Sequence, residues 1–350
     1  MQWGLSPLNF WLMNLPSVKY CPGNLSPVKN GTYCLSFRKD FFQGARVSHI
    51  LDFSSPGQYI SRPEDVELIK HLSISGVQSK FSVRQDGQKL RKVATKGEFI
   101  LKPIPAGVPR AGEVPANEHL TMQLANQVYG ILTARNGMIF YADGEPAYMC
   151  KRFDRKDGEN KFRQEDFAQV AERSAETHGQ NYKYEFSYED VALLMQKYIP
   201  AFRPEIEKFF RLVVFNYLFS NGDAHLKNFS LIETTDGDYV LSPAYDLLCT
   251  RLHSPLERDM APVNGLFNDY NSPSFDANGF YAYDDFYDFG IHVGILPNRV
   301  RRFLEFFITD YKKVSDLVSR SFLSNEAKAE YLNFYRDKLK RLKYSFAGTI

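Results

Sequence analysis

Hydrophobic residues repeat along this chain with both helical and strand periods, which predicts a mixed α and β structure. Residues 204–219 carry apolar side chains on one helical stripe. The sequence Ser220-Asn221-Gly222 is expected to end that helix through a residue with positive φ. Residues 229–232 and 239–241 have strand character around Asp236-Gly237, a strong signal for a two-residue hairpin turn.

The predicted hairpin brings three oxygen-bearing side chains together. A hairpin returns the chain to the end at which the hairpin began, so Asp246 should lie beside Asn228. Asp223 lies in a loop just after the helix. Asp223 is then placed to accept a proton from an attacking hydroxyl, and Asn228 and Asp246 offer the oxygen ligands that Mg²⁺ prefers. The spacing D-x-x-x-x-N is that of the protein kinase catalytic loop. Capping of helices and turns by Asp223 and Asn228 is the alternative.

The rest of the pattern divides the chain into three parts. Residues 1–62 are rich in Pro, Gly, Ser and Asn and predict an irregular segment with a strand or two. Strand patterns are frequent in residues 63–155, and helical patterns dominate residues 156–350. At 350 residues the chain is long enough for two lobes with separate cores.

The first lobe contains candidate groups for binding phosphate. Two predicted strands flank a small-residue loop, in which the backbone N–H groups of Ser75, Gly76 and Val77 can face an anion. An ordinary β-turn is the alternative for this loop. Lys102 ends a strand before a proline, and its ammonium group can hold nucleotide phosphates if it points inward. Simple solvation is common for a lysine in that position.

Three further candidates come from the residues after Lys102. Glu118 opens a predicted helix and is in the right order to orient Lys102, as a helix glutamate does in kinases. Glu113 is a rival partner for Lys102. Backbone groups from Met149 to Lys151 are candidates for contact with adenine, where a strand ends in charged residues. Residues 178–185 form a polar, aromatic loop suited either to contact a substrate or to connect two helices.

Composition excludes several classes of protein. Lys and Arg number 43 and Asp and Glu number 41, and the net charge of +2 implies no general attraction to nucleic acid or membranes. No stretch reaches the roughly 18 apolar residues of a membrane span. The four cysteines lack C-x-x-C spacing, which argues against a zinc site or a disulfide framework and suits a reducing cytoplasm. They are Cys21, Cys34, Cys150 and Cys249.

Several motifs in one order resemble the HipA-like serine/threonine kinases of bacterial toxin–antitoxin modules. They run from about Ser73 to Asn264 and include S-I-S-G-V-Q-S-K, F-I-L-K-P, K-R-F-D-R, N-G-D-A-H-L-K-N-F-S-L, S-P-A-Y-D-L and M-A-P-V-N-G. The resemblance implies an α+β, two-lobed, protein-kinase-like fold related to phosphoinositide kinases. Its first lobe would be mixed α/β, and its second mainly helical.

The resemblance also implies roles for individual residues. The catalytic residues would be Asp223 as base, with His225 and Lys227 in the same loop. ATP would contact Lys102, and Mg²⁺ would bind Asn228 and Asp246. Autophosphorylation would fall on Ser73 and Ser75 and switch the enzyme off through added negative charge.

The short sequence before Ser73 is similar to the HipT form of the family. In that form a small HipS-like protein supplies a missing subdomain and a HipB-like helix-turn-helix antitoxin completes the module, so that DNA is contacted only through the antitoxin. Family members phosphorylate aminoacyl-tRNA synthetases, and this modification blocks translation. A small-molecule or lipid kinase, or a non-catalytic co-repressor that binds an antitoxin, remain alternatives.

Overall fold

The computed structural model describes residues 18–29, 32–56, 80–105, 108–156, 160–254 and 258–346. The chain forms two compact units. Unit 1 comprises the described parts of Met1–His119 together with Ala134–Phe153 and Arg320–Leu323, and unit 2 comprises the rest. The boundary therefore falls inside helix α4 (Val114–Gln127). Residues 120–133 belong to unit 2, although the sequence pattern placed them in the first lobe.

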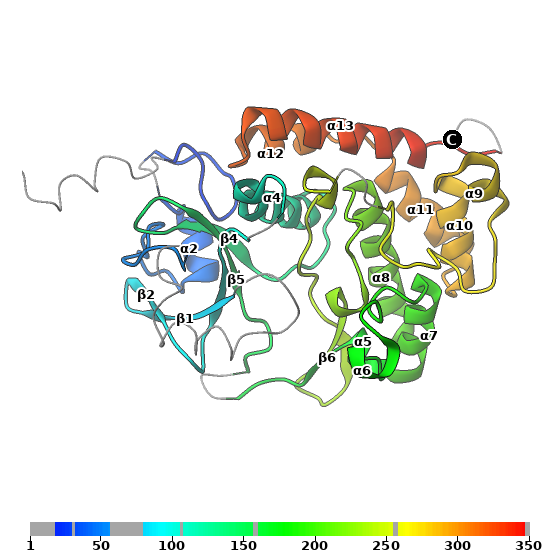
Figure 1. Ribbon diagram of the computed structural model, residues 1–350, viewed down its shortest axis with the longest axis horizontal. Coiled ribbons are helices and arrows are strands. Elements are labelled where there is room, and N and C mark those ends of the chain that lie inside the picture. Colours follow the sequence, from blue (N-terminus) through cyan, green and yellow to red (C-terminus); the bar gives the residue numbers. More distant parts are fainter. Residues whose placement is uncertain are drawn as a thin grey trace, which may run out of the picture. The chain divides into compact units, whose positions relative to one another are not determined.

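Unit 1 is built on a five-stranded sheet with the order β2-β1-β3-β5-β4 (Figure 1). All its neighbouring strands are antiparallel, with registers such as Leu101 opposite Met149 and Phe81 opposite Leu101. β3 is the central strand of this sheet. The strands are β1 (Phe81–Asp86), β2 (Lys89–Lys92), β3 (Phe99–Lys102), β4 (Asn136–Phe140) and β5 (Pro146–Lys151).

Helix α2 (Leu35–Phe41) packs on this sheet and lies in the segment expected to be irregular. Its residues Phe37 and Phe41 are buried with the sheet residue Phe99, and the rings of Phe41 and Phe99 are 5.1 Å apart. Aromatic residues therefore order the N-terminal segment despite its many turn-forming residues.

Unit 2 is mainly helical and surrounds helix α8 (Phe202–Leu218). Every residue of α8 from Leu212 to Leu218 is buried, so this half of the helix is enclosed on all sides and not only along the predicted apolar stripe. The predicted helix is thus confirmed and begins two residues earlier. The other helices are α5 (Phe167–Val170), α6 (Ala175–His178), α7 (Tyr188–Tyr198), α9 (Pro273–Asn278), α10 (Tyr283–His292), α11 (Pro297–Phe307), α12 (Lys312–Arg320) and α13 (Asn325–Leu342), with 3-10 turns η3 (Ala111–Glu113, in unit 1), η4 (Leu226–Asn228) and η5 (Thr250–Leu252).

A three-stranded sheet of order β6-β7-β8 lies beside the start of α8 in unit 2. It consists of β6 (Gln164–Asp166), β7 (Ser230–Glu233) and β8 (Tyr239–Leu241). β7 and β8 pair antiparallel, so the hairpin is confirmed. Its turn differs from the two-residue expectation, because the Thr234 N–H donates to the Asp238 carbonyl and three residues, 235–237, form the loop, with Gly237 at φ 86°. The buried Glu205 carboxylate accepts the Leu241 N–H at 3.0 Å and ties the hairpin to α8.

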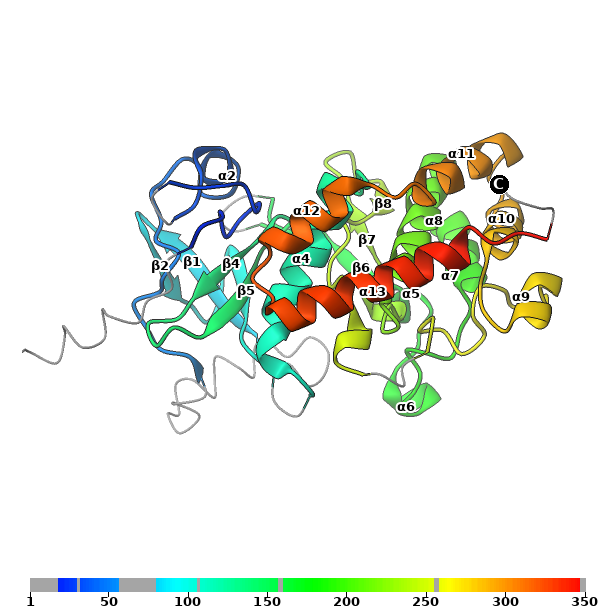
Figure 2. The ribbon, with the colours of Figure 1, turned by 90° about the horizontal axis from the view of Figure 1, so that it is seen from above.

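Helix α13 packs on the C-terminal end of α8 (Figure 2). The rings of Phe219 and Tyr335 are stacked at 5.2 Å, and the Lys338 ammonium lies 4.1 Å from the centre of the Tyr217 ring. The helix end agrees with the expectation, because Ser220, the first residue of Ser220-Asn221-Gly222, has a positive φ of 51°. In the described parts of the chain, no helix is long and apolar enough to cross a membrane.

Candidate active site

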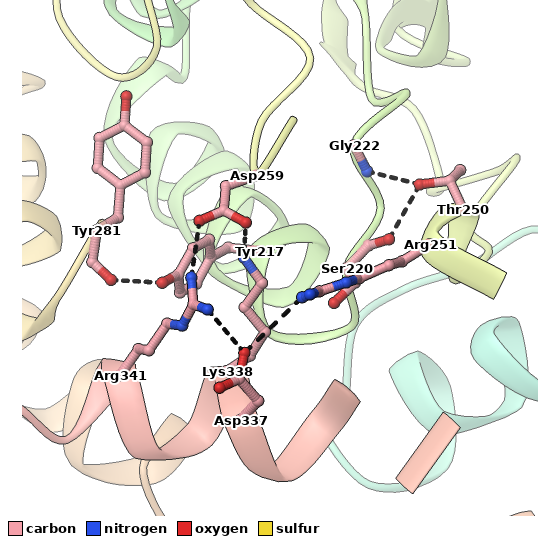
Figure 3. A network of polar contacts seen from close by, with 10 residues as sticks. All are labelled: Tyr217, Ser220, Gly222, Thr250, Arg251, Asp259, Tyr281, Asp337, Lys338 and Arg341. Atoms are coloured by element: carbon pink, nitrogen blue, oxygen red, sulfur yellow. Dashed lines mark hydrogen bonds and ion pairs between the residues drawn. The ribbon is translucent and has the colours of Figure 1, made fainter. Parts of the chain in front are cut away.

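The loop that follows α8 is held in place by Thr250 (Figure 3). The Thr250 hydroxyl accepts the Gly222 N–H at 2.8 Å and donates to the Ser220 carbonyl at 3.0 Å. The Asn221 N–H donates to the Asn216 carbonyl at 2.8 Å. These contacts satisfy backbone hydrogen-bonding groups at the end of α8 and fix the position of the backbone that precedes Asp223.

Helix α13 supports Thr250 through the network in Figure 3. Arg251, which follows Thr250 in the turn η5, lies 3.8 Å from the Asp337 carboxylate of α13. One turn of α13 also supplies Lys338, which is 1% exposed and forms an ion pair with Asp259. Burial lowers the pKa of Lys338 to about 8, although the Asp259 carboxylate opposes this change.

Asp223 is the exposed carboxylate of the loop, with 45% of its side chain accessible. The Tyr184 hydroxyl donates to Asp223 Oδ1 at 2.6 Å, and the Asp223 carbonyl accepts the His225 N–H at 2.8 Å. A carboxylate in this setting is held at a fixed place and still open to a substrate, as a general base requires.

His225 is buried and connects Asp223 with Asn228. Burial lowers the pKa of His225 to about 4, so its imidazole is neutral at pH 7. Its Nε2 lies 3.0 Å from the Lys183 ammonium, which can only donate, so Nε2 accepts and the proton resides on Nδ1. The His225 N–H donates to Asn228 Oδ1 at 3.1 Å, and the Asn228 N–H donates to the His225 carbonyl at 2.9 Å.

Asp246 follows the hairpin and has a left-handed backbone, with φ of 57°. This conformation is uncommon outside glycine and is tolerated by Asp. The preceding residue, Tyr245, donates its hydroxyl to the Lys227 carbonyl at 3.0 Å, so the residues next to Asp246 and Asn228 are in contact. The Lys227 ammonium acts on Asp166, where burial raises the carboxyl pKa and Lys227 opposes the rise.

Unit 1 holds a buried ion pair between Lys102 and Glu118. The Lys102 ammonium lies 2.6 Å from Glu118 Oε1, and the two side chains are 8% and 3% exposed. Lys102 ends β3 and Glu118 lies in the second turn of α4, so sheet and helix together set the position of the ammonium group. Glu113, the rival partner, lies in the short turn η3 before α4.

The two residues expected at adenine lie in β5 of the same sheet as Lys102. Met149 is opposite Leu101 of β3, and its backbone groups take part in strand pairing with β3 and β4, so a contact with adenine stays a prediction. The Lys151 ammonium donates to the Phe41 carbonyl at 3.1 Å inside unit 1. Ser73, Ser75, Gly76 and Val77 lie outside the described residues.

A divalent metal would depend on few protein ligands here. Within the described ranges, no group of three or more His, Cys, Asp or Glu side chains is placed to hold a metal. Asn228 and Asp246 offer one amide and one carboxylate oxygen, and Asn228 Oδ1 keeps a second lone pair beside its hydrogen bond. This donor set fits Mg²⁺, which keeps several waters and takes further oxygens from phosphates.

Three residues that contact the loop were not predicted from the sequence. Lys183, Tyr184 and Thr250 each contact the loop from more than 25 residues away, and only the polar, aromatic character of residues 178–185 gave a signal. Thr250 gave none, because a threonine in a turn has many ordinary uses.

The chain belongs to the HipA-like C-terminal domain family, which residues 72–313 match. A relative from Haemophilus influenzae named "Putative kinase" is 27% identical over 285 residues, which cover 77% of this chain and 82% of the relative. A Sinorhizobium fredii protein, "Putative kinase Y4dM", is 33% identical over 197 residues, which cover 51% of this chain and 45% of that protein.

Solved structures show the same fold class, an α+β kinase-like fold. HipA from Shewanella oneidensis, in a complex with HipB and its operator DNA, has a TM-score of 0.56 and 21% identity, covering 77% of this chain and 63% of HipA. The Helicobacter pylori proinflammatory kinase CtkA has a TM-score of 0.50 and 12% identity, covering 77% of this chain and 93% of CtkA. At these identities the likeness concerns the fold.

Proposed function

We propose that this chain is an ATP- and Mg²⁺-dependent serine/threonine protein kinase, the toxin of a bacterial toxin–antitoxin module. The observation that supports this most directly is the loop 222–228, which presents an exposed Asp223 carboxylate five residues before Asn228. The kinase names of the relatives and the buried Lys102–Glu118 pair agree with it.

The proposed reaction moves the γ-phosphoryl group of ATP to a hydroxyl acceptor. Asp223 accepts the proton of that hydroxyl, and Lys102, oriented by Glu118, contacts the phosphates. Asn228 and Asp246 hold Mg²⁺, which would neutralise negative charge on the phosphates. The backbone N–H of His225 keeps Asn228 Oδ1 in place.

Regulation and partners follow the same family pattern. We propose that Ser73 and Ser75 are autophosphorylated and that the added charge weakens ATP binding. HipA of Shewanella forms a complex with HipB and operator DNA. By analogy, a HipB-like antitoxin binds this chain and DNA is contacted through it, while a small HipS-like protein completes the short form. The proposed substrate is an aminoacyl-tRNA synthetase, modified in the cytoplasm.

Transfer of labelled γ-phosphate from Mg·ATP by the purified chain, alone and with bacterial lysate, tests this function. We expect label on the chain and on one lysate protein, and its loss in Asp223→Asn and Asp246→Asn, which change charge at nearly constant shape. Asp236→Asn is a matched control, because Asp236 is exposed in the β7–β8 turn and should keep full activity.

The outcomes separate the alternatives. Label in a soluble acceptor but not in protein would identify a small-molecule or lipid kinase. Full turnover in Asp223→Asn would refute the site assignment. No transfer by the native chain, together with tight binding of a HipB-like antitoxin, would favour a non-catalytic co-repressor.

A further inference from the structure

Two adjacent residues outside the catalytic loop are bonded to it at three points. Lys183 and Tyr184 lie between α6 and α7. The Tyr184 hydroxyl donates to Asp223 Oδ1 at 2.6 Å and the Lys183 ammonium donates to His225 Nε2 at 3.0 Å. The Leu226 N–H donates to the Lys183 carbonyl at 3.2 Å. This dipeptide therefore contacts the side chains of Asp223 and His225 in the D-A-H-L-K-N sequence.

The dipeptide is itself fixed by backbone contacts on its other side. The Tyr184 carbonyl accepts the Val263 N–H at 2.8 Å, and the Tyr184 N–H donates to the Asn181 carbonyl at 2.8 Å. The Arg173 guanidinium donates to the Glu185 carbonyl. A loop held in this way gives its side chains defined positions, so the hydroxyl of Tyr184 can set the position of another group.

The contact with Asp223 has the geometry of a strong, charge-assisted hydrogen bond. Hydroxyl-to-carboxylate bonds of this kind are about 2.5–2.7 Å long and roughly twice as strong as neutral ones. A carboxylate accepts about four hydrogen bonds, so Oδ2 remains available while Tyr184 holds Oδ1. Among the described residues, none donates a hydrogen bond to Asp223 Oδ2, and 45% of the Asp223 side chain is exposed.

We propose that Tyr184 is a positioning residue for Asp223. It holds Oδ1, so that Oδ2 faces the hydroxyl of the acceptor. This role presupposes the phosphoryl transfer proposed above and adds a residue that no motif assigns. Lys183 acts in parallel by fixing the tautomer of His225, and it also lies 4.9 Å from the centre of the Tyr184 ring.

Tyr184→Phe tests the proposal, since it removes one oxygen and keeps the ring. The probe is Mg·ATP, with label transferred to the chain and phosphate released to water both measured. We expect kcat to fall about 10- to 100-fold, as a small misplacement of a catalytic group does, with KM for Mg·ATP unchanged. In an Asp223→Asn background, the same substitution should have almost no further effect, because the two groups act together.

Two controls keep the test specific. Tyr182→Phe removes a hydroxyl two residues away, for which the described residues provide no hydrogen-bond partner, and should keep full activity. In place of Tyr184, 3-fluorotyrosine retains the hydroxyl and should keep kcat within about threefold of the native value. That rescue, with a thermal midpoint equal to the native one, separates positioning from a fault in folding.

Unchanged kcat in Tyr184→Phe, or an equal fall in Tyr182→Phe, would overturn the proposal. A rise in kcat would also overturn it and would show that the Tyr184 hydroxyl blocks the acceptor position instead. Loss of kcat with no rescue by 3-fluorotyrosine would count against it as well. Absence of turnover in the native chain would refute the proposed function first, and the role of Tyr184 with it.

Discussion

Glu118→Gln should destabilise unit 1 by about 3 kcal/mol. Lys102 and Glu118 are 8% and 3% exposed and their charged atoms are 2.6 Å apart, so the substitution removes a carboxylate charge that stabilises a buried ammonium group. Removing one partner of a buried ion pair costs about 3–5 kcal/mol. Glutamine keeps the length and a hydrogen-bond acceptor, which favours the lower end. This loss is a large part of a typical domain stability of about 5–15 kcal/mol.

Urea denaturation followed by circular dichroism measures this loss. At about 1–3 kcal/mol per molar urea, the midpoint should fall by about 1–3 M. Hydrogen exchange should increase in the amides of β3, which carries Lys102. Glu145→Gln, at an exposed position, is the matched control. Adding Lys102→Met to Glu118→Gln should recover stability, because no buried charge remains. A change below 1 kcal/mol in Glu118→Gln would refute the reasoning.

Two further predictions concern ionisable groups outside the site. Cys34 should be alkylated by iodoacetamide with a midpoint near pH 7, because hydrogen bonds such as that of Ser36 outweigh burial and lower the thiol pKa to about 7. Cys21 should react only at higher pH, because burial raises its pKa to about 11. Equal labelling of both thiols by mass spectrometry would contradict this. The stability difference between Lys338→Met and the native chain should depend on pH, because burial lowers the pKa of Lys338 from 10.5 to about 8. Between pH 8 and 10.5 the unfolded native chain binds more protons than the folded one, so the native chain should gain stability relative to Lys338→Met. A difference that stays constant from pH 7 to 10 in urea titrations would contradict this.

Local sequence signals predicted those parts of the fold that depend on neighbouring residues. The apolar stripe of residues 204–219 predicted α8, and Asp236-Gly237 predicted the hairpin that follows loop 222–228. Helix α2 was not predicted, because its stability depends on burying Phe37 and Phe41 against a sheet whose strands begin about 40 residues later. Pairing over such distances has no periodic signal.

The candidate site shows the same division. The spacing from Asp223 to Asn228 is visible in the sequence, and so are the order of Lys102 and Glu118 and the distance to Asp246. The contacts that hold these residues are not visible in the sequence, since a hydrogen bond between a hydroxyl and a carboxylate 39 residues apart produces no sequence pattern. The helix end shows both cases, because the positive φ at Ser220 agrees with the prediction, whereas the hydrogen bond from the Thr250 hydroxyl to the Ser220 carbonyl was not predicted.

Separate segments of unit 2 therefore control successive residues of one short loop. Thr250 binds its first backbone groups, Tyr184 and Lys183 bind Asp223 and His225, and Tyr245 binds the carbonyl of Lys227. If each group acts only when correctly placed, the D-x-H-x-x-N spacing is necessary for catalysis but insufficient. A chain with this spacing but without the hydroxyls at the positions of Tyr184 and Thr250 should bind nucleotide and transfer phosphate slowly. On the proposed function, activity would therefore require these long-range hydroxyl contacts in addition to the motif.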